Sequence, residues 1–203
     1  MTTGTVVGHG SGRATGASVI GRTVVLVPVK AFAQAKRRLG AVLDDDDRQR
    51  LVRQMAEQVL AAAAPFDVAV VCDDTEVADW ARHRGALVIW EPGRGLNGAV
   101  EAGVERLSAM GAREVTVAHG DLPRASGLAT LEPFDGVTLV PDHQHNGTNV
   151  VRLPASCGFR FSYGPGSFSR HLAECGRIGV AVRVLDVPGL AIDVDVPADL
   201  RWT

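Results

Sequence analysis

The stretch Val115-Thr116-Val117-Ala118-His119-Gly120-Asp121-Leu122-Pro123 is an apolar run that stops at an aspartate followed by a proline. Such a run is typical of a buried strand, and residues just beyond the carboxyl ends of strands form the ligand-binding edge of open α/β sheets. A second stretch, Leu190-Ala191-Ile192-Asp193-Val194-Asp195-Val196-Pro197, has the same form. We therefore expect an α/β fold with carboxylates gathered at one sheet edge.

The three aspartates of these stretches predict a metal site. Side chains two residues apart in a strand point the same way, so Asp193 and Asp195 are expected on one face with the apolar residues on the other. Adjacent carboxylates raise each other's pKa unless a cation lies nearby. Hard ions such as Mg²⁺ prefer oxygen ligands, and Asp121 is the natural third ligand. Taken alone, Asp121 is explained as a strand-end turn and Asp193 as a cap.

Strand-like runs alternate with helical ones from residue 23 onward. Strands are expected at 24–29, 66–72, 86–90, 114–118, 136–140, 149–153, 180–185 and 190–194, and helices at 51–60, 76–84, 97–110 and 167–175. Asn97 occupies an expected N-cap position and Gly111 closes the same helix. Continuous Val/Ile/Leu strands separated by helices predict a mostly parallel sheet with helices on both faces.

Composition limits the class of protein. With 203 residues, of which 46% are hydrophobic, the chain is expected to form one domain over 23–203, preceded by a mobile Gly/Ser/Thr-rich tail at 1–22. The formal charge of -2 argues against nucleic acid or an anionic membrane as partner. No apolar stretch is long enough for a membrane span, so a soluble, cytoplasmic protein is expected. Its three cysteines have no spacing typical of a disulfide framework or a zinc site.

Basic residues cluster on the loop that leaves the first strand. Lys30 and the run Ala35-Lys36-Arg37-Arg38 lie where a loop opens onto the carboxyl edge of the sheet, which suits binding of a polyphosphate. The loop lacks both the P-loop and the dinucleotide fingerprint. Taken alone, the cluster is better explained as a solvated basic loop.

Two glycine-containing turns lead into helices. The turn Glu91-Pro92-Gly93-Arg94-Gly95-Leu96-Asn97 is equally well explained as a site for a base edge or phosphate and as an ordinary connection with an asparagine cap. Gly164, Gly166 and Ser167 precede the 167–175 helix, where backbone amides can close on an anion, and Thr148 can add a hydroxyl.

Other polar residues are assigned no chemistry. His143 and His145 lie in a polar loop and are better explained as solvated than as metal ligands. His119 is expected to be packed and hydrogen-bonded to a neighbouring strand. The acidic run at 44–47 is expected to precede a helix and to complement its dipole.

Taken together and in order, these motifs resemble one family. The set consists of Pro28, Lys30, Ala35-Lys36, Gly95-Leu96-Asn97, His119-Gly120-Asp121-Leu122-Pro123, Pro141-Asp142, Gly147-Thr148-Asn149, Phe161, Tyr163-Gly164, Ser167-Phe168, His171 and Asp193-Val194-Asp195. It is similar to the guanylyltransferases of deazaflavin coenzyme F-420 biosynthesis, which activate 2-phospho-L-lactate or phosphoenolpyruvate with GTP. The likeness spans residues 23 to 200.

The resemblance implies a fold and a set of site residues. The implied fold is a three-layer nucleotidyltransferase sandwich related to nucleotide-sugar pyrophosphorylases. Phosphoenolpyruvate contacts fall on Thr148, Gly164 and Ser167; Mg²⁺ ligands on Asp121, Asp193 and Asp195; and nucleotide contacts on Pro28, Lys30, Lys36, Gly95 and Asn97. Gly120 stands where many relatives carry alanine, and Arg37 where they often carry serine.

The implied reaction is attack of the phosphate of phosphoenolpyruvate on the α-phosphorus of GTP, with release of pyrophosphate and formation of enolpyruvoyl-diphospho-guanosine. A phosphate monoester has a second pKa of about 6, so the nucleophile is already ionised at neutral pH and needs no Ser-His-Asp arrangement. Charge neutralisation by Mg²⁺, Lys30 and Lys36 is expected to supply the catalysis. The product is expected to pass to the next enzyme of the pathway.

Several alternatives remain open from the sequence. The acceptor can instead be 2-phospho-L-lactate or 3-phosphoglycerate, and phosphoenolpyruvate is favoured only by an Ala-, Arg- and Gly-rich composition like that of actinobacterial relatives. A nucleotidyltransferase for another acceptor usually shows a G-x-G loop after the first strand, which Val29-Lys30-Ala31-Phe32 does not. A non-catalytic nucleotide-binding module, with aspartates that only cap turns, is the alternative that is not an enzyme.

Overall fold

The computed structural model describes residues 21–203, so the predicted tail at 1–22 lies outside the described residues except for its last two positions. The carbonyl of Arg22 accepts hydrogen bonds from the backbone N–H groups of Arg113, at 2.8 Å, and Glu114, at 3.1 Å. This residue is therefore already joined to the sheet. The helices and strands are β1 (Thr23–Pro28), η1 (Phe32–Gln34), η2 (Arg37–Ala41), α1 (Asp45–Ala62), β2 (Asp67–Cys72), α2 (Thr75–His83), β3 (Leu87–Trp90), α3 (Gly95–Ala109), β4 (Glu114–Ala118), β5 (Val137–Pro141), β6 (Thr148–Pro154), α4 (Ser167–Ile178), β7 (Val182–Val184) and η3 (Pro197–Trp202).

The strands form one seven-stranded sheet in the order β3-β2-β1-β4-β6-β5-β7. Neighbouring strands run parallel from β3 through β4 and again between β5 and β7, whereas β6 runs antiparallel to both of its neighbours. The prediction of a mostly parallel sheet is therefore confirmed. The antiparallel β6 follows β5 after a short connection, which is how a chain returns without a crossover helix.

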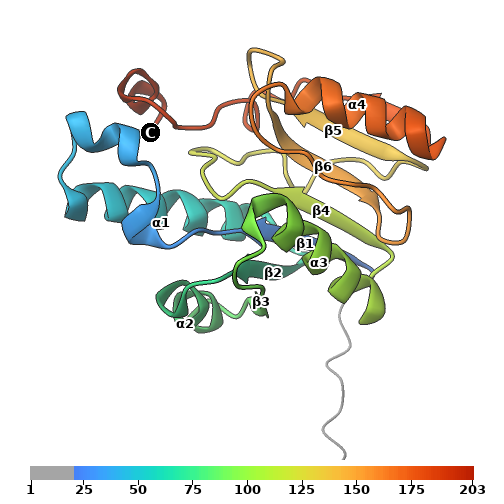
Figure 1. The fold of residues 1–203 in the computed structure, drawn as a ribbon, viewed down its shortest axis with the longest axis horizontal. Helices are drawn as coiled ribbons and strands as arrows, with labels where there is room; N and C mark the ends of the chain where they lie inside the picture. The colour runs from blue at the N-terminus through green and yellow to red at the C-terminus, as the bar shows by residue number, and fades with distance from the viewer. Residues whose placement is uncertain (1–20) are drawn as a thin grey trace, which may run out of the picture.

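Helices cover both faces of the sheet, as expected for strands that are apolar on both sides (Figure 1). Alternate residues of β1 serve the two layers: Val25 and Val27 pack with α1 and α2, while Val24 and Leu26 pack with α3. All four are at most 1% exposed. The sheet is thus the middle of a three-layer sandwich with a core on each side.

The strand predicted at 190–194 is wrong. The segment after β7 turns back on itself, with the N–H of Leu190 bonded to the carbonyl of Val187 at 2.8 Å, and then runs on without joining the sheet. The carbonyl of Leu190 accepts a hydrogen bond from the side-chain amide of Asn149 at 2.9 Å. A side chain therefore takes the place of the strand neighbour that a ladder would require.

The N-cap predicted at Asn97 is also wrong, because α3 begins two residues earlier, at Gly95. Asn97 lies in the first turn, and its Oδ1 accepts a hydrogen bond from the N–H of Tyr163 at 2.7 Å. An asparagine near a helix start has a side chain free for such a contact, and here it joins α3 to a distant loop.

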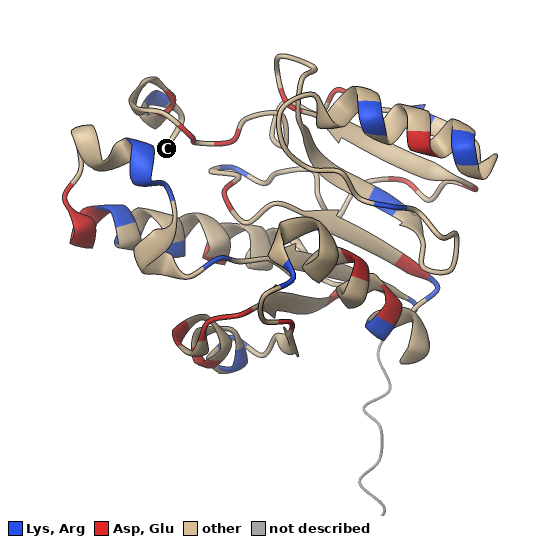
Figure 2. Ribbon diagram, viewed as in Figure 1, with Lys and Arg blue, Asp and Glu red and all other residues tan. Residues whose placement is uncertain are grey.

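Acidic residues mark the start of α1, as expected (Figure 2). Asp44 is the N-cap, and its Oδ1 accepts a hydrogen bond from the N–H of Asp47 at 2.8 Å. The first turn is entirely acidic, which complements the positive end of the helix dipole. None of the described helices combines the length and the apolar character needed to cross a membrane.

Gly189 makes the closest backbone approach in the segment that leads to Asp193. A Cβ added there would lie 2.4 Å from the carbonyl oxygen of Ser126, which belongs to the backbone and has no rotamer to change. We expect Gly189→Ala to lower the free energy of unfolding by about 1–3 kcal/mol, measured by denaturant unfolding.

Gly176→Ala is the matched control, because Gly176 lies in α4 and an added Cβ there meets nothing within 4 Å. Alanine at this position should raise stability by about 0.5–1 kcal/mol through its better helix propensity. Equal stability of Gly189→Ala and the parent would show that the two segments are not held in contact.

Candidate active site

The loops that leave β1 and β4 meet at the carboxyl edge of the sheet. From β1 the chain adds β2 and β3 on one side and then returns to place β4 on the other side of β1. The ends of β1 and β4 therefore flank a topological switch point, where open α/β sheets bind ligands. The two loops are in close contact at Gly120, where an added Cβ would lie 3.3 Å from the carbonyl oxygen of Pro28.

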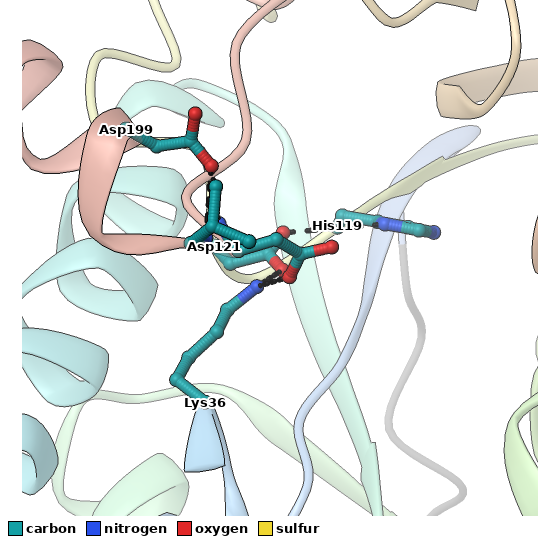
Figure 3. Close-up of polar contacts among 6 residues, drawn as sticks. Lys36, His119, Asp121 and Asp199 are labelled. Carbon is teal, nitrogen blue, oxygen red and sulfur yellow. Dashed lines mark hydrogen bonds and ion pairs between the residues drawn. The ribbon is translucent and has the colours of Figure 1, made fainter. Parts of the chain in front are cut away.

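Three carboxylates and one ammonium group meet at this point. Asp121 follows β4, and Asp193 and Asp195 come from the segment between β7 and η3; one oxygen of each lies within 4.8 Å of the others. The Nζ of Lys36 contacts Oδ2 of Asp121 and lies 2.5 Å from Oδ1 of Asp195 (Figure 3). The structure thus brings together the three aspartates that the sequence singled out.

The irregular segment that carries two of these aspartates is anchored without a strand ladder. The carbonyl of Ala191 accepts a hydrogen bond from the N–H of His143 at 2.8 Å, and the side chain of Val194 is completely buried. Oδ2 of Asp199 accepts from the N–H groups of Asp195 and Val196, both at 2.9 Å. These contacts fix the backbone on both sides of Val194, and so fix the directions of the neighbouring carboxylates.

The charges of the cluster shift one another's pKa values. Burial raises the pKa of Asp193 to about 6, and the negative charges of Asp121 and Asp195 act in the same direction. Burial would also raise the pKa of Asp121, but the ammonium of Lys36 outweighs it and holds this pKa below its usual range. Burial would lower the pKa of Lys36, and the carboxylates of Asp121 and Asp195 raise it instead. Lys36 is therefore a permanent positive charge.

A cleft of about 720 Å³ opens beside the cluster. Of the residues predicted to bind nucleotide, Pro28, Lys30, Lys36 and Gly95 line it. Asn97 does not line the cleft, and its side chain instead accepts a hydrogen bond from the backbone N–H of Tyr163. The basic residues Arg37 and Arg38 also line the cleft and, with Lys30 and Lys36, offer positive charge to a polyanion; the carboxylates of Asp73, Glu91, Asp121 and Asp195 line it too.

His119 is packed between neighbouring residues, and its surroundings disfavour the protonated imidazole. Its backbone N–H bonds to the carbonyl of Asn149, as expected for a residue that joins a neighbouring strand, and its ring lies 4.7 Å from the ring of Tyr163. Burial lowers the pKa of His119, although the carboxylate of Asp121 opposes this. Its Nδ1 is 4.0 Å from Oδ1 of Asp121, which is too far for a hydrogen bond.

The three residues predicted to hold the acceptor lie together, but not in the wall of the 720 Å³ cleft. Thr148 begins β6 and Ser167 begins α4, and the N–H of Ser167 bonds to the carbonyl of Gly164 at 2.9 Å. The ring of Tyr163 stands between this group and the carboxylates, 4.7 Å from His119 and 5.1 Å from His171. The two predicted sites are therefore adjacent regions of one sheet edge.

Arg170 and Asn146 shape the loop around Gly164, and neither was predicted to have a role. The guanidinium of Arg170 donates to the carbonyls of Ser162, at 2.8 Å, and Pro165, at 2.7 Å. Oδ1 of Asn146 accepts from the N–H of Gly166 at 3.1 Å. Arg170 lies in the first turn of α4, so its side chain can reach the carbonyls of the loop just before the helix. This closeness in sequence is the signal from which the contact could have been predicted.

Comparison with known proteins places this site in a family. The family model described as "Guanylyl transferase CofC like" matches residues 23–202. A phosphoenolpyruvate guanylyltransferase from Sphaerobacter thermophilus is 37% identical over 188 residues, covering 88% of this chain and 91% of the relative. One from Rubrobacter xylanophilus is 39% identical over 184 residues, covering 86% of this chain and 90% of the relative.

Solved structures share the architecture at much lower identity. A nucleotidyl transferase from Methanothermobacter thermautotroptrophicus superposes with a TM-score of 0.61 at 14% identity, covering 89% of this chain and 95% of that one. The likeness shows that the three-layer sandwich is the nucleotidyltransferase fold. With the family match over residues 23–202, the chain belongs to the CofC-like guanylyl transferase family.

Proposed function

We propose that this protein transfers GMP from GTP to phosphoenolpyruvate, as the names of its relatives suggest, and that it serves coenzyme F-420 biosynthesis. A phosphate oxygen of the acceptor forms a bond to the α-phosphorus of GTP, the bond from that phosphorus to the β-phosphate oxygen breaks, and pyrophosphate leaves. The product is enolpyruvoyl-diphospho-guanosine, which passes to the next enzyme of the pathway. The convergence of Asp121, Asp193 and Asp195 beside a cleft that Lys30, Lys36, Arg37 and Arg38 line is the observation that carries the proposal.

The carboxylate cluster fits a divalent cation such as Mg²⁺. Ligand oxygens lie about 2.0–2.1 Å from Mg²⁺ and about 2.3–2.6 Å from Ca²⁺, so oxygens on opposite sides of one ion are about 4.2 Å apart for Mg²⁺ and about 5 Å apart for Ca²⁺. One oxygen of each carboxylate lies within 4.8 Å of the others, so small side-chain rotations bring all three within reach of one ion. Oδ1 of Asp121 is also buried with no hydrogen-bond partner among residues 21–203. When bound, the ion supplies charge stabilisation at the phosphorus under attack.

The remaining groups of the site bind and align two polyanions. Lys30, Lys36, Gly95 and, at the end of β1, Pro28 line the cleft that would hold GTP. Thr148, Gly164 and Ser167 would hold the acceptor acid. Holding the acceptor phosphate near the α-phosphorus offsets the repulsion between the two substrates and the entropy of bringing them together.

No general base is required for this reaction. The acceptor phosphate has a second pKa of about 6 and is mostly ionised at neutral pH. The imidazole nearest the carboxylates, that of His119, has a lowered pKa because it is buried, and a neutral ring does not add charge to the cluster. The site therefore works through charge and position.

An acceptor panel tests the proposed function. The protein is incubated with GTP, Mg²⁺ and, in separate reactions, phosphoenolpyruvate, 2-phospho-L-lactate or 3-phosphoglycerate, and pyrophosphate is measured; CTP replaces GTP in a parallel series. We expect release with GTP and phosphoenolpyruvate. Release only with another acid would correct the acceptor. GTP binding without turnover of any acceptor would favour a nucleotide-binding module.

Neutralising a carboxylate of the cluster should abolish most turnover. We expect Asp121→Asn and Asp195→Asn to lower kcat by about 100-fold or more, because removing a ligand of a catalytic ion removes transition-state stabilisation. Asp79→Asn is the control, since Asp79 is exposed on α2 and, among residues 21–203, forms an ion pair with Arg82 alone. Turnover of either cluster variant at the parental rate would contradict the metal assignment.

Lys36 should compete with a metal ion for the same oxygens. Removing its charge leaves the carboxylates without a counterion, so Lys36→Met is expected to bind Mn²⁺ about tenfold more tightly than the parent in the absence of nucleotide, and GTP more weakly. Free Mn²⁺ is followed by electron paramagnetic resonance.

Lys30→Met is the matched control for this experiment. Lys30 is exposed in the same cleft, and no ion pair joins it to a carboxylate among the described residues. Its replacement should leave Mn²⁺ affinity unchanged. Equal Mn²⁺ affinity of Lys36→Met and the parent would mean that the ammonium and the ion do not share a position.

A further inference from the structure

His171 is a completely buried polar residue with two hydrogen bonds, and it takes no part in the proposed reaction as described above. It lies on α4, one turn after Ser167 and on the same face of the helix. The backbone N–H of Ser162 lies 3.0 Å from Nε2 of His171, and Oγ1 of Thr148 lies 3.0 Å from Nδ1. The ring therefore connects the Gly164 loop to one of the predicted acceptor contacts.

These two contacts determine which nitrogen of His171 carries the proton. A backbone N–H can only donate, so Nε2 must accept the bond from Ser162 and has no hydrogen. In the neutral imidazole the other nitrogen, Nδ1, then carries the hydrogen and donates it to Oγ1 of Thr148. Rings of Phe159 and Tyr163, at 5.5 Å and 5.1 Å, hold the imidazole in this orientation.

The direction of this bond determines what the hydroxyl of Thr148 can do. A hydroxyl has one hydrogen to donate and can accept two bonds. Since Oγ1 accepts from His171, its own hydrogen is left for another partner, and no second partner is found for it among residues 21–203. A buried hydroxyl with an unused donor suits an anion, and each of the three candidate acceptor acids is a polyanion.

We propose that His171 is a positioning residue that, by donating to Oγ1, keeps the hydroxyl of Thr148 aimed as a donor at the anionic acceptor. The inference rests on the proposed function and deepens it, because it names the residue that prepares one acceptor contact. His171 itself touches no substrate. Its effect on catalysis passes entirely through Thr148.

The arrangement persists over the working pH range. Burial lowers the pKa of His171 to about 4, and the nearby Arg170 and His119 act in the same direction, while Glu174 opposes them weakly. A protonated ring would present a hydrogen at Nε2 to the N–H of Ser162, and both hydrogen bonds could not then be kept. The neutral tautomer is therefore the one present above about pH 5.

A double-mutant cycle tests the inference. His171→Phe keeps an aromatic ring among Phe159 and Tyr163 but removes both nitrogens, and Thr148→Val removes the hydroxyl while keeping the shape. We expect each variant to lower kcat/KM for the acceptor about tenfold, as for loss of a hydrogen bond to a charged group, with KM for GTP unchanged. The double variant should also lose about tenfold in total, because both changes remove the same interaction.

Two further measurements separate positioning from a general structural role. His171→Asn offers an amide N–H near the position of Nδ1 and should recover part of the acceptor kcat/KM. If the phenylalanine variant does not fold, the partial loss expected of His171→Asn is measured in its place. In the parent, kcat/KM for the acceptor should show no ionisation assignable to His171 between pH 6 and 8, so the pH profile of His171→Asn should match the parental one.

The outcomes distinguish this inference from the proposed function. If the parent releases no pyrophosphate with any acceptor, the proposed function and this inference fall together. If the parent is active but the losses of His171→Phe and Thr148→Val multiply to about a hundredfold, His171 acts independently of Thr148 and this inference alone is overturned. An unchanged acceptor kcat/KM in a folded His171→Phe or Thr148→Val variant overturns it as well.

Discussion

Repulsion among three carboxylates is the constraint on which the site depends. Asp121, Asp193 and Asp195 are held within 4.8 Å of one another, partly out of water, and such a group is unstable without positive charge. In the structure Lys36 supplies that charge from the loop after β1, so a residue distant in sequence holds together the ends of two other segments. The same three carboxylates would hold a metal ion in the proposed reaction, and Lys36 would then be free to contact a triphosphate.

The sheet and the irregular segments around it position the site residues in different ways. The parallel strands β1 and β4 set the switch point, and their buried side chains leave little freedom to the loops that follow. Asp193 and Asp195, by contrast, are placed by side-chain contacts to the backbone, from Asn149 at one end and Asp199 at the other. Local hydrogen bonds of this kind can fix a carboxylate as firmly as a strand can, provided that the backbone groups between them are satisfied.

Sequence reasoning predicted the parts of the fold that follow from periodicity. The alternating apolar residues of β1 and the helical spacing in α1 identify those elements without any knowledge of their neighbours. The segment at 190–194 is not a strand although Ile192, Asp193 and Val194 alternate as in one, because the side chain of Asn149 takes the place of the backbone partner that a strand needs. Whether an alternating segment joins a sheet depends on long-range packing that a local pattern does not contain.

The candidate site was predictable in its acidic residues and less so in its supporting contacts. Aspartates at the ends of apolar runs are visible in the sequence, and the structure brings all three together. The partners of Asn97 and His171 are not visible, because each bonds to a residue of the Gly164 loop or to β6, across the sheet edge. Such pairs depend on how distant loops pack, and no spacing rule links them.

The backbone at Lys36 has a left-handed conformation, with φ of 52° and ψ of 38°. Glycine and asparagine adopt this conformation more readily than lysine does, so local energetics alone would favour replacing the lysine during evolution. The charge of the carboxylates acts against that drift. Among homologues, the residue at this position should therefore indicate whether the neighbouring acidic cluster has been kept. A lineage that lost the aspartates would be free to replace the lysine with glycine. A lineage that kept them would retain a strained lysine.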